Sequence, residues 1–164
     1  MASRTISSPI GDLILVASEE GLSGLGWNAD VADHPGGARH PAEAHLDQTE
    51  LELGEYFAGF RSTFAVTLDR RARSGFRGEV LDVLETVPFG TTVSYTELAR
   101  MAGRPRAARA VGSAMATNPI AIIVPCHRVL PAGGGPGRYA AGTKAKELLL
   151  RIESGSVSRP EVVR

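Results

Sequence analysis

The sequence contains one cysteine among 164 residues. A lone cysteine cannot form an intramolecular disulfide or a cysteine-rich zinc site, so we expect a reducing, intracellular setting. No apolar run approaches the roughly 20 residues that a membrane-spanning helix needs. Residues 1–5 lead into an alternating pattern without the apolar segment of a signal peptide. Together these absences predict a cytoplasmic protein that does not bind a membrane.

The chain has no net charge either, although its two halves are oppositely charged. Residues 1–70 contain 4 Arg or Lys and 11 Asp or Glu, net −7, whereas residues 71–164 contain 14 and 7, net +7. A basic half-chain suits a polyanionic partner such as nucleic acid. Alternatively, two oppositely charged lobes attract one another, and charge alone favours neither interpretation. The length fits one core or two small lobes that share an interface.

The first half of the chain is predicted to form a small sheet and one helix. Residues 4–27 combine apolar strand patterns with turn-forming residues, as in a hairpin or small meander. Residues 46–60 have the apolar spacing of an amphipathic helix, and residues 64–68 alternate as a strand. The arginine-rich segment 70–75 marks a boundary. We therefore expect an N-terminal α/β lobe at 1–72 and a C-terminal domain at 73–164.

Three histidines of the first half, His34, His40 and His45, are irregularly spaced among proline and glycine residues. Metal sites usually need ligands at regular, short spacings on defined elements. The sequence therefore predicts no metal site.

The second half is predicted to be mostly helical. A helix over residues 76–87 stops at a Pro-Phe-Gly turn, and Thr96 is expected to cap a second helix. After a break at 103–105, residues 107–115 form a helix rich in small residues, and a last helix runs through Ile152. Two short helices around a glycine-containing turn are typical of a helix-turn-helix. The expected fold class is mixed α/β (α+β), with a sheet-and-helix lobe followed by a helical lobe.

The cysteine follows an apolar run that stops at a proline. Residues 122–124 predict a strand, and Pro125 should end it because proline lacks a backbone donor, so that Cys126 is presented at the strand end. His127 and Arg128 follow directly, and adjacent cations lower the pKa of a thiol. The plainer alternatives are a buried, inert cysteine and a surface histidine.

These residues resemble a known family. The match is carried by Pro125-Cys126-His127-Arg128-Val129, by the upstream Asn118-Pro119 and Arg109-Ala110-Val111-Gly112, and by a downstream Tyr and Glu. This pattern is similar to the active-site signature of the O6-alkylguanine-DNA alkyltransferases, also called methylated-DNA–protein-cysteine methyltransferases. The resemblance is close over residues 73–153 and loose over the first 70.

The resemblance implies DNA repair by direct reversal. The alkyl group of O6-alkylguanine in double-stranded DNA would pass irreversibly to Cys126, once per protein molecule, with the base flipped out of the duplex. Activity on O4-alkylthymine is left open. The resemblance further implies no cofactor, no metal and no obligate protein partner, so we expect a monomer, with cooperative binding to DNA left open.

The resemblance also implies roles for catalytic residues. Cys126 would accept the alkyl group, and His127 would take the thiol proton through a bridging water. Glu153 would orient and charge-stabilise the imidazole. Asn118 would brace the loop before the cysteine, and the hydroxyl of Tyr95 would contact the extruded base and help protonate the departing guanine.

A second set of residues is implied to bind DNA. Arg109 would enter the base stack from the minor groove and fill the gap left by the flipped nucleotide. Small residues would let the helix backbone lie close to the groove: Ala107, Ala110 and Gly112. Positioning charges would come from Arg104, Arg106 and Arg128, with a role within the fold as the alternative for Arg128.

The substrate pocket is implied to include Met115, Val129, Tyr139 and Ala140. Val129 would help to read the guanine edge, and Tyr139 with Ala140 would close over the alkyl group. The chain departs from the family pattern after this tyrosine, where Ala140-Ala141-Gly142 replaces a more glycine-rich segment. The extra methyl of Ala141 is expected to narrow the pocket.

Three other functions are compatible with parts of the sequence. A lesion-binding protein without chemistry would keep Arg109 but would not need Cys126. A thiol hydrolase would use the cysteine, histidine and glutamate but leave the helix-turn-helix without a purpose. A helix-turn-helix regulator would need a dimerisation segment, which the sequence does not provide.

Overall fold

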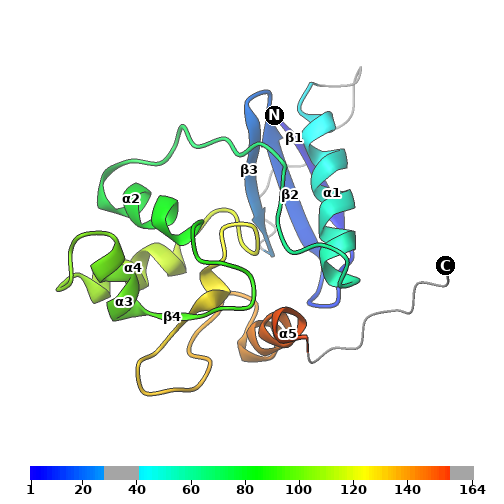
Figure 1. Ribbon diagram of the computed structural model, residues 1–164. Helices are drawn as coiled ribbons and strands as arrows, with labels where there is room; N and C mark the ends of the chain where they lie inside the picture. Colours follow the sequence, from blue (N-terminus) through cyan, green and yellow to red (C-terminus); the bar gives the residue numbers. More distant parts are fainter. Residues whose placement is uncertain (28–40, 156–164) are drawn as a thin grey trace.

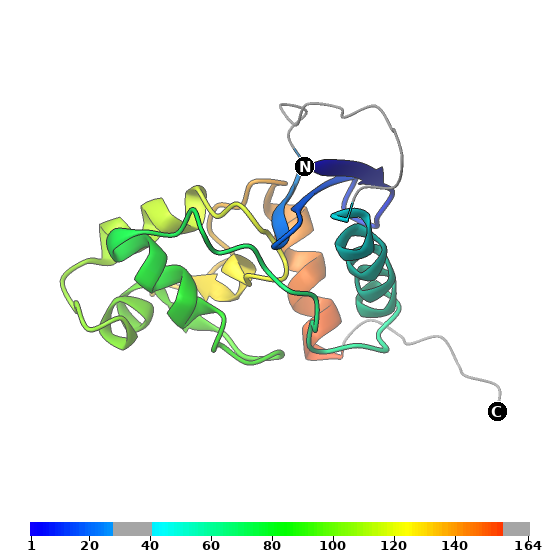
Figure 2. The ribbon, with the colours of Figure 1, turned by 90° about the horizontal axis from the view of Figure 1, so that it is seen from above.

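The computed structural model describes residues 1–27 and 41–155, which form two lobes (Figures 1 and 2). The N-terminal lobe contains an antiparallel sheet with strand order β1-β2-β3 and one helix, α1. The C-terminal lobe contains four helices, a two-stranded parallel sheet and a 3-10 turn, η1. This arrangement confirms the predicted fold class. The bounds of the N-terminal elements are β1 Ala2–Ile6, β2 Leu13–Ser18, β3 Gly21–Gly26 and α1 Glu43–Phe57.

The sheet forms because β2 alternates between two environments. Leu13, Leu15 and Ala17 are fully buried, while the residues between them are only partly buried. One face of the sheet is covered by α1, which buries Leu46 and Leu53 (Figure 1). Alternation of this kind places every second side chain on the same face of a strand.

Two distant segments close the free edge of β3. Leu22 donates its backbone N–H to Thr67 O at 2.8 Å, and Leu25 donates to Pro119 O at 2.9 Å. The expected strand at 64–68 is wrong except for a single bridge at Leu68. Its earlier amides are bound elsewhere: the carboxylate of Glu52 accepts Ala65 N–H at 2.7 Å and Val66 N–H at 3.3 Å.

The expected strand at 122–124 is also wrong, since these residues form a tight turn. Ile122 has a positive φ of 71°, and Val124 donates to Ile120 O at 3.0 Å. The side chain of Asn118 fixes the turn, because its Nδ2 donates to Val124 O at 2.8 Å and its Oδ1 accepts from Ile120 N at 3.2 Å. Ile122 and Val124 are buried in the core and Ile123 packs against it, which explains why the sequence resembles a buried strand.

The helical lobe positions the functional residues. Its elements are α2 Gly75–Leu84, β4 Val93–Ser94, α3 Tyr95–Met101, α4 Ala108–Ala116, η1 Cys126–Arg128, β5 Val129–Leu130 and α5 Thr143–Ser154. Helices α3 and α4 pack against each other across the 102–107 turn and form the predicted helix-turn-helix. The cap of α3 is Ser94, whose Oγ accepts Glu97 N–H at 3.0 Å, so the expected cap at Thr96 is wrong.

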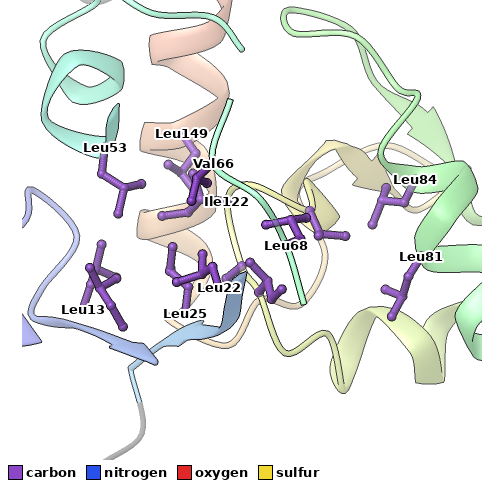
Figure 3. Close-up of a cluster of buried hydrophobic side chains, with 14 of the residues drawn as sticks. Leu13, Leu22, Leu25, Leu53, Val66, Leu68, Leu81, Leu84, Ile122 and Leu149 are labelled. Carbon is purple, nitrogen blue, oxygen red and sulfur yellow. The ribbon is translucent and has the colours of Figure 1, made fainter. Parts of the chain in front are cut away.

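One buried cluster connects the lobes. In Figure 3, Leu13 and Leu53 lie on the side of the N-terminal lobe, and Ile122 and Leu149 lie near the middle of the cluster. Leu81 and Leu84 lie in the helical lobe. The turn that precedes Cys126 therefore contributes to the shared core. None of the helices in the described ranges is long and apolar enough to cross a membrane.

Candidate active site

Cys126 begins the 3-10 turn η1 and lines a cavity of about 980 Å³. The parallel pairing of β4 with β5, Val93 to Val129 and Ser94 to Leu130, brings the start of α3 beside η1. Tyr95 consequently lines the same cavity as Cys126. The other predicted site residues on its wall are Gly112, Met115, Asn118, Tyr139 and Ala140.

Cys126 is a free cysteine and is partly buried. Burial raises its pKa, while a hydrogen bond with the Asn118 side chain and the charge of Lys146 act in the opposite direction and do not outweigh burial. The expectation that adjacent cations lower the pKa of this thiol is therefore wrong. The thiol is protonated at neutral pH and needs a base before it can attack.

His127 directly follows Cys126 in the sequence and is fully buried. Its Nε2 lies 2.6 Å from Oε2 of Glu153, near the end of α5, and its Nδ1 is buried without a hydrogen-bond partner among the described residues. Burial lowers the pKa of His127 despite the neighbouring carboxylate. A neutral imidazole whose Nε2–H donates to Glu153 leaves the lone pair of Nδ1 free to accept a proton.

Glu153 is buried at the centre of a polar network. Its Oε1 accepts from Arg128 Nε at 2.7 Å, and its Oε2 accepts from Tyr56 Oη at 2.6 Å, from His127, and from Arg128 Nη2 at 3.2 Å. Burial alone would raise the pKa of Glu153, but the hydrogen bonds outweigh it and lower the pKa to about 2. The carboxylate is therefore ionised throughout the neutral range.

Arg128 belongs to this network, which corrects its expected place on the DNA-binding surface. Its side chain is 8% exposed, pairs with Glu153, and donates through Nη1 to Val87 O at 2.6 Å. Its guanidinium also lies over the ring of Phe89, 5.9 Å from the centroid. The alternative role within the fold is the one that the structure shows.

Two buried polar residues of this region escaped the sequence analysis. Tyr56 occupied an ordinary apolar position of the predicted helix, and nothing in that pattern distinguishes its hydroxyl. Lys146 is fully buried and donates through Nζ to Val129 O at 2.8 Å and to Arg138 O at 3.4 Å. The sequence did contain a sign that Lys146 is buried, because a lysine three residues before Leu149 lies on the apolar face of α5.

The predicted DNA-binding residues lie together on the turn and on α4. Arg104, Arg106, Arg109 and Ala110 are exposed, while Ala107 and Gly112 are partly buried. A Cβ at Gly112 would meet no atom within 4 Å, so packing inside the protein does not require glycine there. The guanidinium of Arg104 lies 5.2 Å from the ring centroid of Phe76.

The predicted pocket residues divide into two groups. Met115, Tyr139 and Ala140 line the cavity, whereas Val129 is fully buried outside it. Ala141 is not among the lining residues, so the expected narrowing of the pocket by its methyl group is wrong. Trp27 of the N-terminal lobe also lines the cavity and meets the Tyr139 ring edge to face, with the centroids 5.5 Å apart.

No cluster of three metal-ligating side chains occurs within residues 1–27 and 41–155. His34 and His40 lie outside these residues. A ring nitrogen of His45 lies 3.1 Å from Glu19 O.

The fold and the site together define a helix-turn-helix protein with a thiol, a histidine and a glutamate beside the helix pair. The sequence-family model of the 6-O-methylguanine DNA methyltransferase DNA-binding domain matches residues 75–155. The family model of the ribonuclease-like domain of the same methyltransferases matches residues 1–70. The chain belongs to the 6-O-methylguanine DNA methyltransferase family.

Individual relatives cover almost the whole chain. The methylated-DNA–protein-cysteine methyltransferase of Mycolicibacterium paratuberculosis is 43% identical over 92% of this chain and 90% of its own length. The constitutive enzyme of that name from Bacillus subtilis is 35% identical over 91% and 93%. The crystal structure of Mycobacterium tuberculosis OGT in complex with DNA has a TM-score of 0.83 and 39% identity, covering 94% of both chains.

Proposed function

We propose that this protein repairs DNA by transferring the alkyl group of O6-alkylguanine to Sγ of Cys126. The observation that carries this proposal is the placement of a free thiol in a cavity, backed by the His127–Glu153 pair and adjoining the helix-turn-helix. Named relatives with the same activity, and a related structure bound to DNA, support it.

The chemistry is a displacement at the alkyl carbon. The thiol proton passes to Nδ1 of His127 through a bridging water, and the resulting thiolate forms the S–C bond as the C–O6 bond breaks. The departing guanine takes a proton from the hydroxyl of Tyr95, which lines the cavity, and the tyrosinate regains its proton from solvent. The thioether product is stable, so each molecule acts once.

The proposed DNA surface is the turn and the exposed side of α4. Arg109 replaces the flipped nucleotide in the stack, while Arg104 and Arg106 contact phosphates. Open space at Gly112 supports a close approach of the groove to the helix backbone. Because the contacts are made mainly to backbone and shape, binding is weakly sequence-specific.

The remaining proposals concern the protein as a whole. It acts as a monomer in the cytoplasm, where its thiol remains reduced. We place the boundary between its parts at residues 72 and 73, a division that the two matched family models support. O4-alkylthymine is a candidate second substrate.

The direct test is the intact mass of the protein after incubation with a duplex that carries one O6-methylguanine, with Cys126→Ser as control. Wild type should gain one methyl group at Cys126, stoichiometrically and without turnover. Binding to the lesion duplex without a mass gain would instead identify a lesion-binding protein, and turnover of an acyl substrate would identify a thiol hydrolase.

A further inference from the structure

Tyr56 belongs to the N-terminal lobe, but its hydroxyl lies in the polar network of the helical lobe. It is on the buried face of α1 and is fully buried. Helix α1 lies next to α5 in Figure 2, and its lower end points toward α5 in Figure 1; Tyr56 reaches Glu153 across this lobe interface. The proposed function gives this buried hydroxyl no role.

We propose that Tyr56 is a positioning residue for alkyl transfer: its hydroxyl fixes the Glu153 carboxylate against His127 and, by sharing the charge on Oε2, keeps the imidazole neutral. This inference rests on the proposed function, in which His127 accepts the thiol proton. Tyr56 does not line the cavity that holds Cys126. It acts on the reaction through Glu153.

The geometry at one carboxylate oxygen carries the inference. Tyr56 Oη and His127 Nε2 each lie 2.6 Å from Oε2 of Glu153. Burial and the charge of Glu153 raise the pKa of Tyr56 far above neutral pH, so its hydroxyl remains a donor. An oxygen that already accepts a strong hydrogen bond stabilises an imidazolium less well, so this donor opposes protonation of His127.

Several other ionisable groups surround the histidine, and the inference must hold in their presence. Burial lowers the pKa of His127 most, Glu153 raises it, and the charges of Arg128 and Lys146 lower it further. Removing the tyrosine hydroxyl leaves more charge on Glu153 Oε2 and leaves burial, Arg128 and Lys146 unchanged. The pKa of His127 therefore rises. The groups that face this network are Tyr56 from α1, Cys126 and Arg128 from η1, Tyr139 from the following loop, and Lys146 from α5.

The ring and the hydroxyl of Tyr56 have separable roles. The ring lies 5.4 Å from that of Phe57, 5.5 Å from that of Phe64 and 6.2 Å from that of Phe89, between centroids. A Tyr56→Phe variant keeps these contacts and loses only the hydrogen bond. A Phe64→Leu variant disturbs the packing of the same ring and keeps the hydroxyl, which makes it the matched control.

The experiment is a pH titration of the His127 imidazole by NMR in histidine-labelled protein, with the signal assigned through a His127→Asn variant. Single-turnover methyl transfer is measured over the same pH range. In Tyr56→Phe the titration midpoint of His127 should rise by about one pH unit. At pH values below the wild-type midpoint, methyl transfer by Tyr56→Phe should be about tenfold slower than in wild type. The difference in rate should shrink as the pH rises. Phe64→Leu should lower Tm and leave the midpoint unchanged.

The outcomes separate this inference from the proposed function. An active wild type with the same His127 midpoint in Tyr56→Phe overturns the inference alone. A wild type that gains no methyl group overturns the proposed function and, with it, the role of Tyr56 in transfer. If Tyr56→Phe does not fold, the tyrosine Cζ signal of wild type decides: a Tyr56 signal that shifts with the His127 midpoint supports the inference, and an unresponsive one overturns it.

Discussion

Replacing Arg128 by methionine tests whether this arginine belongs to the fold. The variant keeps an unbranched side chain of similar length but removes one donor to each Glu153 oxygen, at 2.7 and 3.2 Å, and the donor to Val87 O at 2.6 Å. Breaking a buried ion pair by removing one partner typically costs about 3–5 kcal/mol. We expect a loss of that size in the free energy of unfolding at pH 7, measured by urea denaturation.

The pH dependence of this loss follows from the carboxylate. The pKa of Glu153 is lowered from 4.5 to about 2, so its stabilising contribution is complete above pH 4.5 and disappears as the pH falls toward 2. The difference between wild type and Arg128→Met should therefore narrow over that interval. Tyr56 and His127 continue to donate to Glu153 in the variant, which sets the lower end of the expected range.

The matched control is Arg106→Met, which removes an exposed arginine of the 102–107 turn. This control should leave the free energy of unfolding within about 0.5 kcal/mol of wild type and weaken DNA binding with a shallower salt dependence. The reasoning is refuted if Arg128→Met instead behaves like the control, with unchanged stability and a reduced salt dependence of DNA binding.

Three further predictions concern the proposed machinery. Arg109→Ala should slow methyl transfer on duplex DNA by at least about tenfold, because unstacking a base costs a few kcal/mol, while transfer from single-stranded DNA changes little; equal losses on both substrates would contradict its role in flipping. Asn118→Ala should lower the free energy of unfolding by about 1–3 kcal/mol, since Val124 O loses its donor, and urea denaturation checks this. Glu153→Gln should reduce the acid-dependent loss of stability between pH 4.5 and about 2, measured by urea denaturation, so an unchanged loss in the variant would assign it to another group.

The sequence predicted features that depend on local patterns. The alternation in β2 and the break at 103–105 between the two helices of the helix-turn-helix are determined by neighbouring residues, and the structure confirms the elements that they predicted, with Ser94 in place of Thr96 as the cap of α3. The roles of Cys126, His127 and Arg109 stay predictions until the transfer assay is done. What the structure adds is that Cys126 lines one cavity together with Tyr95 and Asn118, and that His127 is paired with Glu153.

The failures arise where a distant side chain binds the backbone. Residues 64–68 have a strand pattern, but Glu52 takes two of their amides, and no local pattern reveals a carboxylate from another helix. Residues 122–124 have the apolar composition of a strand because they are buried between the lobes, while Asn118 fixes them as a turn. Composition reports burial in both cases and does not report hydrogen-bond partners.

The same reasoning explains why the cations beside the cysteine were misread. Adjacency in sequence placed Arg128 next to the thiol, but the 3-10 turn directs its guanidinium to Glu153, away from a role in lowering the thiol pKa. The carboxylate thereby stays ionised, and the histidine between them stays neutral and basic. In the proposed mechanism the activation of Cys126 depends on proton acceptance by His127, and we expect Arg128, Glu153 and Tyr56 to act by setting the charge of that one imidazole.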